Sequence, residues 1–220
     1  MPMTPRPRFA ILGSGRGSNA VALMSAFRQD MLDAELAVVI GNVTQAPILA
    51  RAVEYGYPSE LLEHRGLTRK EHEQRLRQRL DRHRVDHLLL AGYQRLLSPE
   101  FVRDFSGVIL NIHPSLLPDF PGRTAVADQW QAGVPIAGAT VHVVDAKVDT
   151  GPILLCGSLL IRGDEGVEGL AERIRSEVEH VIYPRAVQLL LHRLRTGSPL
   201  HQEEARLRPP HCAHPTPAKS

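Results

Sequence analysis

Short apolar runs alternate with amphipathic stretches along most of the chain, and this alternation constrains the fold more than any other feature. Seven apolar runs are expected to form strands, at residues 9–12, 36–40, 59–62, 87–91, 107–112, 137–144 and 153–160. An alternation of strands and helices is typical of a doubly wound, mostly parallel sheet with helices on both faces. The sequence therefore predicts an α/β fold of the Rossmann type.

The stretches between these runs carry helix signals. Helices are expected from the end of a glycine-rich turn to about residue 29, and at residues 46–55 and 68–82. Ser98 can cap a short helix that has Pro99 at its first position. A long final helix is expected to begin near Asp164 and Glu165, with one apolar face formed by Val167, Leu170, Ile174, Val178 and Ile182. Residues 113–123 hold three prolines and a glycine, so an irregular loop is expected there.

The domain is expected to span residues 8–195, because a chain of 220 residues fits one α/β domain with a tail. From residue 196 onward apolar residues become few and prolines interrupt any periodicity. This composition predicts a disordered tail at residues 196–220. The histidines His211 and His214 in that tail could bind a metal weakly, but a flexible histidine-rich tail is the preferred interpretation.

Charge and cysteine content argue against several function classes. The 26 basic and 24 acidic residues nearly cancel, and the arginines of residues 75–84 alternate with acids, so nucleic-acid binding is not expected. No apolar run approaches the roughly 20 residues of a membrane span, and the first residues do not resemble a secretion signal. Cys156 and Cys212 have neither metal-ligand nor disulfide spacing. We expect a soluble cytoplasmic protein without a metal or a membrane partner.

A glycine-rich turn follows the first expected strand and contains Gly13, Gly15 and Gly17. Glycines at such a position let backbone amides approach an anion at the start of a helix, which favours a phosphate ligand. Ser18 and Asn19 could instead serve only as helix caps. A nicotinamide dinucleotide is not expected, because no acid follows the second expected strand to hold the ribose.

Three polar side chains suggest acyl-transfer chemistry. Asn111 and His113 lie two residues apart at the carboxyl end of an expected strand, so they project to the same side. Open α/β sheets bind ligands at that edge. Asp149 follows in a polar loop. An amide, an imidazole and a carboxylate can together stabilise an oxyanion and move a proton. The alternative is that the asparagine and the histidine only satisfy local hydrogen bonds.

Five motifs occur in order along the chain: GRGSN (15–19), AGYQRLL (91–97), NIHPSLLP (111–118), VHVV followed by DTGP (141–144 and 149–152), and EHVIYP (179–184). Together they resemble the glycinamide ribonucleotide formyltransferase family of folate-dependent, doubly wound α/β enzymes. The similarity extends from about residue 8 to residue 195. It implies transfer of a formyl group from 10-formyltetrahydrofolate to the amine of glycinamide ribonucleotide in purine biosynthesis.

The resemblance also implies a role for individual residues. The catalytic residues would be Asn111, His113 and Asp149. The ribonucleotide would be bound by Gly17, Ser18, Asn19, Arg69 and Glu179. The folate would be bound by Arg95, Leu96, Leu97, Val144 and Asp145. Asn111 and a protonated His113 would stabilise the oxyanion, and Asp149 would keep His113 charged and accept a proton through water. No metal is implied, and the protein is expected to be a monomer or a homodimer.

The sequence departs from the family pattern at residues 123–128. By the resemblance, Thr124 occupies the position of a family histidine that supports the catalytic aspartate. This departure leaves open another amine acceptor, such as an amino-sugar nucleotide. A non-catalytic folate-binding protein and a dinucleotide-dependent oxidoreductase are further alternatives. Methionyl-tRNA is not an expected acceptor, because the chain has no room for a tRNA-binding domain.

Overall fold

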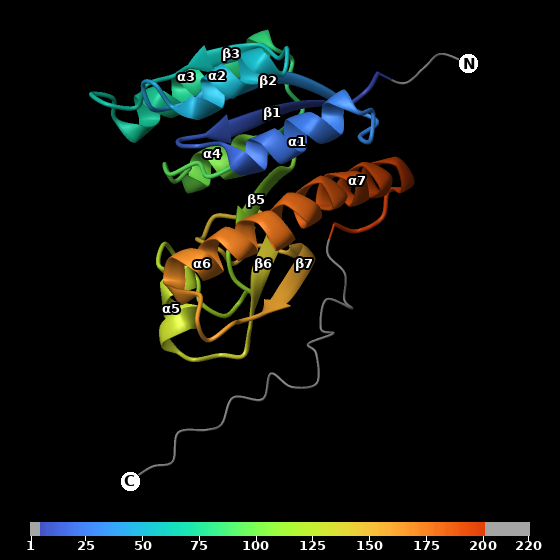
Figure 1. Cartoon of the computed structure of the whole chain (residues 1–220). Helices are drawn as coiled ribbons and strands as arrows, with labels where there is room; N and C mark the ends of the chain where they lie inside the picture. Colours follow the sequence, from blue (N-terminus) through green and yellow to red (C-terminus); the bar gives the residue numbers. More distant parts are fainter. Residues whose placement is uncertain (1–4, 201–220) are drawn as a thin grey trace.

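A computed structural model describes residues 5–200, which form a seven-stranded sheet with helices on both faces (Figure 1). The strand order is β3-β2-β1-β4-β5-β6-β7. The strands are β1 Arg8–Gly13, β2 Glu35–Gly41, β3 Ser59–Leu61, β4 His87–Leu90, β5 Ile109–His113, β6 Ile136–Val143 and β7 Ile153–Leu160. The predicted α/β fold is confirmed. Residues 201–220, most of the predicted disordered tail, lie outside the described residues.

The direction of the strands reverses at β6 and again at β7. β1 to β5 pair in parallel, whereas β6 and β7 run antiparallel to their neighbours. In the antiparallel pair of β5 and β6, Asn111 lies opposite His142 and His113 lies opposite Thr140. The register therefore brings two imidazole residues and one amide residue to the same part of the sheet.

The helices cover the two faces of the sheet in separate layers. They are α1 Ser18–Arg28, α2 Pro47–Glu54, α3 Arg69–Arg82, α4 Pro99–Asp104, α5 Ala125–Gln131, α6 Gly166–Arg173, a π-helical turn η1 Ile174–Glu179, and α7 His180–Thr196. Phe9 and Ile11 of β1 face a core that α1, α2 and α7 share. Ala10 and Leu12 face a second core with α3 and α4. Alternate residues of one buried strand thus anchor both layers.

Several local predictions are confirmed and others need correction. Thr68 caps α3 in a capping box with Glu71, and Ser98 caps α4 by accepting a hydrogen bond from the Phe101 amide. α5 lies where no helix was expected. The expected single final helix consists of α6, η1 and α7, with Pro184 inside α7. Neither Ser18 nor Asn19 caps α1, because Gly17 is the N-cap residue and no side chain caps the helix.

Residues beyond the expected domain end also belong to the folded part. α7 reaches Thr196, and Leu200 packs against the larger core. Among residues 5–200, no helix has both the length and the apolar character that a membrane span requires.

Tyr183 connects α7 to the two central strands that carry the site. Its side chain is fully buried, and its hydroxyl lies 3.0 Å from the Leu90 carbonyl and 3.1 Å from the Leu110 carbonyl. Tyr183→Phe leaves both carbonyls without this donor, so we expect the free energy of unfolding to fall by about 1–3 kcal/mol. Urea denaturation measures the change, with Tyr55→Phe as a control at a less buried position. An unchanged midpoint for Tyr183→Phe would contradict this role.

Candidate active site

A cavity of about 260 Å³ opens at the carboxyl edge of the sheet, beside β5 and β6. Asn111 of β5 and His142 of β6 form part of its wall, together with the loop that joins β6 to β7. The predicted site residues that line this cavity are Arg69, Arg95, Leu96, Leu97, Asn111, Val144, Asp145 and Asp149. The structure thus brings together every predicted folate-binding residue and two of the three predicted catalytic residues.

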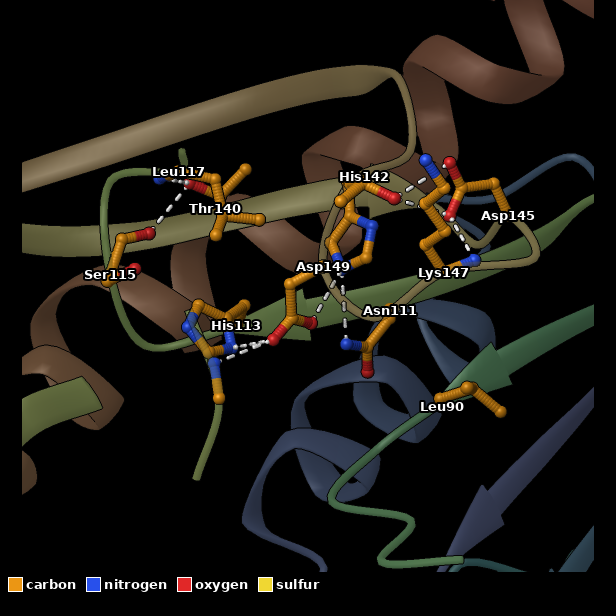
Figure 2. A network of polar contacts seen from close by, with 12 residues as sticks. Leu90, Asn111, His113, Ser115, Leu117, Thr140, His142, Asp145, Lys147 and Asp149 are labelled. Atoms are coloured by element: carbon orange, nitrogen blue, oxygen red, sulfur yellow. Dashed lines mark hydrogen bonds and ion pairs between the residues drawn. The ribbon is translucent and has the colours of Figure 1, made fainter. Parts of the chain in front are cut away.

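Asn111, His142 and Asp149 form a connected polar group on the cavity wall (Figure 2). The Asn111 amide nitrogen Nδ2 lies 3.2 Å from His142 Nε2, which accepts a hydrogen bond from it only in the tautomer that carries the proton on Nδ1, and His142 Nδ1 lies 3.2 Å from the Val143 carbonyl. His142 Nε2 also lies 3.6 Å from Asp149 Oδ1, beyond hydrogen-bond distance. The Asn111 amide has two N–H groups, so one remains available to a bound molecule.

His113 approaches Asp149 from another direction and does not line the cavity. Its Nδ1 lies 3.4 Å from Asp149 Oδ2, and its Nε2 lies 2.9 Å from the Phe120 carbonyl. Both ring nitrogens therefore face acceptors, and the imidazolium form can donate to both. In this arrangement His113 is buried behind Asp149, as Figure 2 shows for the labelled side chains.

The backbone fixes the position of the Asp149 carboxylate. Asp149 has a left-handed φ of 56°, and its Oδ2 accepts a hydrogen bond of 3.0 Å from the Gly122 amide. At Gly151, an added Cβ would lie 1.7 Å from the Val143 carbonyl oxygen, so glycine is required for the chain to turn back along β6. Two separate backbone constraints therefore hold the loop against the end of the strand.

The surroundings of Asp149 lower the pKa of its carboxyl group. The interaction with the His142 side chain is the largest cause, and partial burial opposes it. The Gly122 amide and the charge of His113 also lower the pKa. Asp149 is therefore a carboxylate throughout the neutral pH range.

The glycine-rich turn forms a second part of the site. Gly17 has φ 71°, and an added Cβ would lie 2.7 Å from Ile48 Cβ, so both the backbone and the space demand glycine. Asn19 Nδ2 donates a hydrogen bond of 2.7 Å to Glu179 Oε2, whereas its buried Oδ1 has no hydrogen-bond partner among residues 5–200. Burial raises the pKa of Glu179, and the hydrogen bond from Asn19 opposes this effect. Two predicted ribonucleotide-binding residues from distant segments thus meet.

Hydrogen bonds connect the glycine-rich turn to the cavity wall. The Ser14 amide donates to the Gly92 carbonyl, and the Ser14 hydroxyl accepts from the Gln94 amide. Arg95 donates from its guanidinium to the His64 and Leu67 carbonyls, at 3.2 and 3.1 Å. The segment that follows β4 is therefore fixed on both sides.

Comparison with known families explains why these features occur together. Residues 7–187 match the family described as formyl transferase, and this span contains the whole polar group. The chain belongs to the formyl transferase family.

Individual members resemble this formyl transferase over most of its length. It is 38% identical to the phosphoribosylglycinamide formyltransferase of Bacillus subtilis, over 84% of this chain and 94% of that protein. It is 34% identical to the formyltetrahydrofolate deformylase of Haemophilus influenzae, over 86% of this chain and 67% of that protein. It is also 41% identical to a trifunctional purine biosynthetic protein of Drosophila pseudoobscura pseudoobscura, over 84% of this chain and 14% of that much longer protein.

Solved structures agree with the sequence comparison. The glycinamide ribonucleotide transformylase 1 of Symbiobacterium toebii superposes with a TM-score of 0.82 at 38% identity, over 85% of this chain and 88% of that one. At this identity and coverage, the likeness extends beyond the general sheet topology. This formyl transferase therefore shares its overall fold with the solved transformylase.

His142 is the member of the polar group that sequence reasoning did not select. It stands within the VHVV motif, but its contact with Asn111 depends on the antiparallel register of β5 and β6. The concern over Thr124 also needs correction, because its hydroxyl donates to Asp128 at 2.8 Å while His142, His113 and Gly122 contact Asp149. Support for the carboxylate in this formyl transferase does not depend on residue 124.

His142→Ala is expected to lower the turnover of this formyl transferase by about 10- to 100-fold. The substitution removes the side chain that contributes most to the low Asp149 pKa and that lies 3.2 Å from the Asn111 amide. The Asp149 pKa should therefore rise toward its ordinary value, and the acid limb of the kcat profile should move to higher pH. Kinetics from pH 4 to 8 measure both effects.

An unchanged acid limb would indicate that His142 has a purely structural role. The variant His142→Asn keeps a polar side chain at this position, so it should recover part of the activity.

Proposed function

We propose that this formyl transferase is a phosphoribosylglycinamide formyltransferase. It transfers the formyl group of 10-formyltetrahydrofolate to the amine of glycinamide ribonucleotide, in the de novo synthesis of purines. The main support is the polar group of Asn111, His142 and Asp149 on the wall of a cavity, in a chain that covers 94% of the Bacillus subtilis enzyme of that name. An amide donor beside an ionised carboxylate suits acyl transfer.

The folate donor is proposed to bind in the cavity beside β5 and β6. Leu96, Leu97 and Val144 supply apolar surface for a flat ring, while Arg95 and Asp145 supply fixed polar groups. Asp145 is itself held in place, because its carboxylate accepts hydrogen bonds from the Lys147 amide and the Thr150 hydroxyl. An apolar pocket with a few oriented polar groups is typical of a cofactor site.

The ribonucleotide is proposed to bind at the glycine-rich turn, with its phosphate against Gly17, Ser18 and Asn19. The start of α1 offers amide groups that no side chain caps, which favours an anion there. The unpaired Asn19 Oδ1 and the buried Glu179 beside it would accept hydrogen bonds from the sugar hydroxyls. Arg69 of α3 lies at the cavity, where it would approach the reacting molecules.

The proposed reaction begins when the amine nitrogen attacks the formyl carbon and the carbonyl electron pair moves to oxygen. The free N–H of Asn111 donates to this oxyanion. Asp149, directly or through water, accepts the proton that the nitrogen loses. The intermediate collapses by breaking the bond between the carbon and the folate nitrogen, which takes up the proton that Asp149 accepted. His113 supplies positive charge behind Asp149, and it reaches the oxyanion itself only if its ring turns away from Phe120.

A second candidate is hydrolysis, in which water replaces the amine. It is supported by the 34% identity with the Haemophilus influenzae deformylase, although this chain covers only 67% of that protein. The decisive assay follows the release of tetrahydrofolate from 10-formyltetrahydrofolate with glycinamide ribonucleotide, with an amino-sugar nucleotide, and without an acceptor. We expect release that depends on glycinamide ribonucleotide. Equal release without an acceptor would indicate the hydrolase, and folate binding without release would indicate a non-catalytic protein.

We further propose that the enzyme acts on small molecules in the cytoplasm, without nucleic-acid or membrane partners and without a metal. Among residues 5–200, no group of three or more His, Cys, Asp or Glu side chains is arranged to hold a metal ion. The active protein would be a monomer or a homodimer. Light scattering during size-exclusion chromatography distinguishes these two states.

A further inference from the structure

A second cavity, of about 540 Å³, lies at the opposite edge of the sheet, where β1 and β2 begin. Its walls come from the segment before and at the start of β1, from the start of β2, and from the residues at the end of α3. The charged residues that line it are Arg6, Arg8, Glu35, Arg82, His83 and Arg84. It shares no residue with the cavity of the proposed active site.

Four arginines line this cavity, whereas Glu35 is the one acidic residue among its lining residues. Arg8 is fixed by Glu35 and by a hydrogen bond of 3.0 Å from its Nε to the His83 carbonyl. Arg6 pairs with Asp33 at 3.2 Å. These two arginines are therefore each paired with a carboxylate.

The other two arginines lack such compensation. The carboxylate nearest to Arg82 is that of Glu60, at 3.9 Å, and Glu60 already binds Arg79 at 2.9 Å and His83 at 2.7 Å. Arg84 is exposed and has no ion pair within residues 5–200. The cavity therefore presents two guanidinium groups that are available to an anion.

The backbone of Arg84 is in a strained conformation. Its φ is 52°, at the turn where the Arg84 amide bonds to the Asp81 carbonyl and the Val85 amide to the Leu80 carbonyl. Glycine is the preferred residue at such a helix end, because a Cβ is strained there. The negative end of the α3 dipole explains why the cationic residues Arg79 and Arg82 are favourable near the end of this helix. It does not explain why a residue other than glycine occupies the left-handed position 84.

We propose that this cavity binds a small multivalent phosphate anion, either inorganic polyphosphate or the phosphate chain of a nucleoside triphosphate. Guanidinium groups bind phosphate oxygens in pairs, and Arg82 and Arg84 have the free donors to do so. Arg6 and Arg8, each paired with a carboxylate, line the opposite wall. The ligand stabilises the folded protein by binding it, without competing for the cavity beside β5 and β6.

The test is calorimetric titration of the full chain with inorganic tripolyphosphate and, separately, with ATP. Arg84→Gly removes one guanidinium and relieves the strained backbone, so this variant should fold at least as well as the wild type. We expect it to bind tripolyphosphate at least about tenfold more weakly. Arg103→Ala is the control, because Arg103 is an exposed arginine on α4 that pairs with Asp104 and lies outside the cavity. It should bind like the wild type.

The remaining outcomes separate the possible sources of the phosphate and the possible locations of the site. Similar affinities for tripolyphosphate and ATP would support recognition of the phosphate chain alone, while much tighter binding of ATP would support a nucleotide ligand. The proposal is overturned if neither ligand binds at millimolar concentration. It is also overturned if Arg84→Gly binds like the wild type, if Arg103→Ala weakens binding equally, or if 10-formyltetrahydrofolate displaces the anion.

Discussion

Asp149→Asn is expected to reduce turnover by about 10²- to 10⁴-fold, with little change in folate binding. The carboxylate is the proposed acceptor of the proton that the attacking amine loses, and an amide cannot take this proton. The carboxylate also lies 3.4 Å from His113 Nδ1 and 3.6 Å from His142 Nε2. The measurement is kcat with saturating 10-formyltetrahydrofolate, together with the dissociation constant of the folate.

The fold of the Asp149→Asn variant should be preserved. Asparagine has nearly the same size as aspartate and tolerates the left-handed backbone of this position, and its carbonyl oxygen can still accept from the Gly122 amide. Asp30→Asn makes the same chemical change at another left-handed aspartate, which is exposed at the end of α1. We expect normal turnover in this control. Normal turnover in Asp149→Asn would remove the proposed role.

The low pKa of Asp149 also makes a prediction about stability. Because the folded-state pKa lies below the unfolded value of about 3.9, the carboxylate stabilises the folded protein above that pH. This contribution is lost as the pH falls through the folded-state pKa. Asp149→Asn should therefore reduce stability at pH 7 more than at pH 3, and urea denaturation at the two pH values measures the difference.

The sequence was sufficient for the framework of the fold because buried strands of a doubly wound sheet are continuous apolar runs. Residues 36–40, for example, lie within β2, and every residue of β2 after Glu35 is buried. The carboxyl edge of the sheet was equally predictable, because Asn111 stands near the end of such a run. The five motifs then identified the family, which the match over residues 7–187 confirms.

The contacts within the site were less accessible to sequence reasoning. His142 and Asn111 are 31 residues apart, and only the antiparallel pairing of β5 and β6 places them opposite each other. Nothing in a single sequence fixes that register. α5 was missed for a different reason, because the expectation for residues 123–128 rested on the family pattern. The local sequence forms a helix there, and the Gln129 side chain of this helix donates a hydrogen bond to the Pro114 carbonyl.

His113→Ala is expected to lower turnover by about 10²- to 10³-fold, the effect of losing one stabilising donor in other acyl-transfer enzymes. The imidazole is enclosed between Asp149 and the Phe120 carbonyl, so its removal takes the proposed positive charge from the carboxylate and a hydrogen bond from the loop. These two consequences must be separated, because loss of the loop contact alone could also disturb the site.

Ser115→Ala provides that separation. The buried Ser115 hydroxyl contacts the Asp119 and Phe120 carbonyls of the same loop at 2.6 and 3.1 Å, and its removal leaves the imidazole in place. We expect Ser115→Ala to lower kcat less than tenfold, since it removes only contacts that hold the loop. Equal losses in the two variants would mean that His113 acts only as an anchor for residues 119–120. A much larger loss in His113→Ala would support an electrostatic role, because only that variant removes the charge beside Asp149.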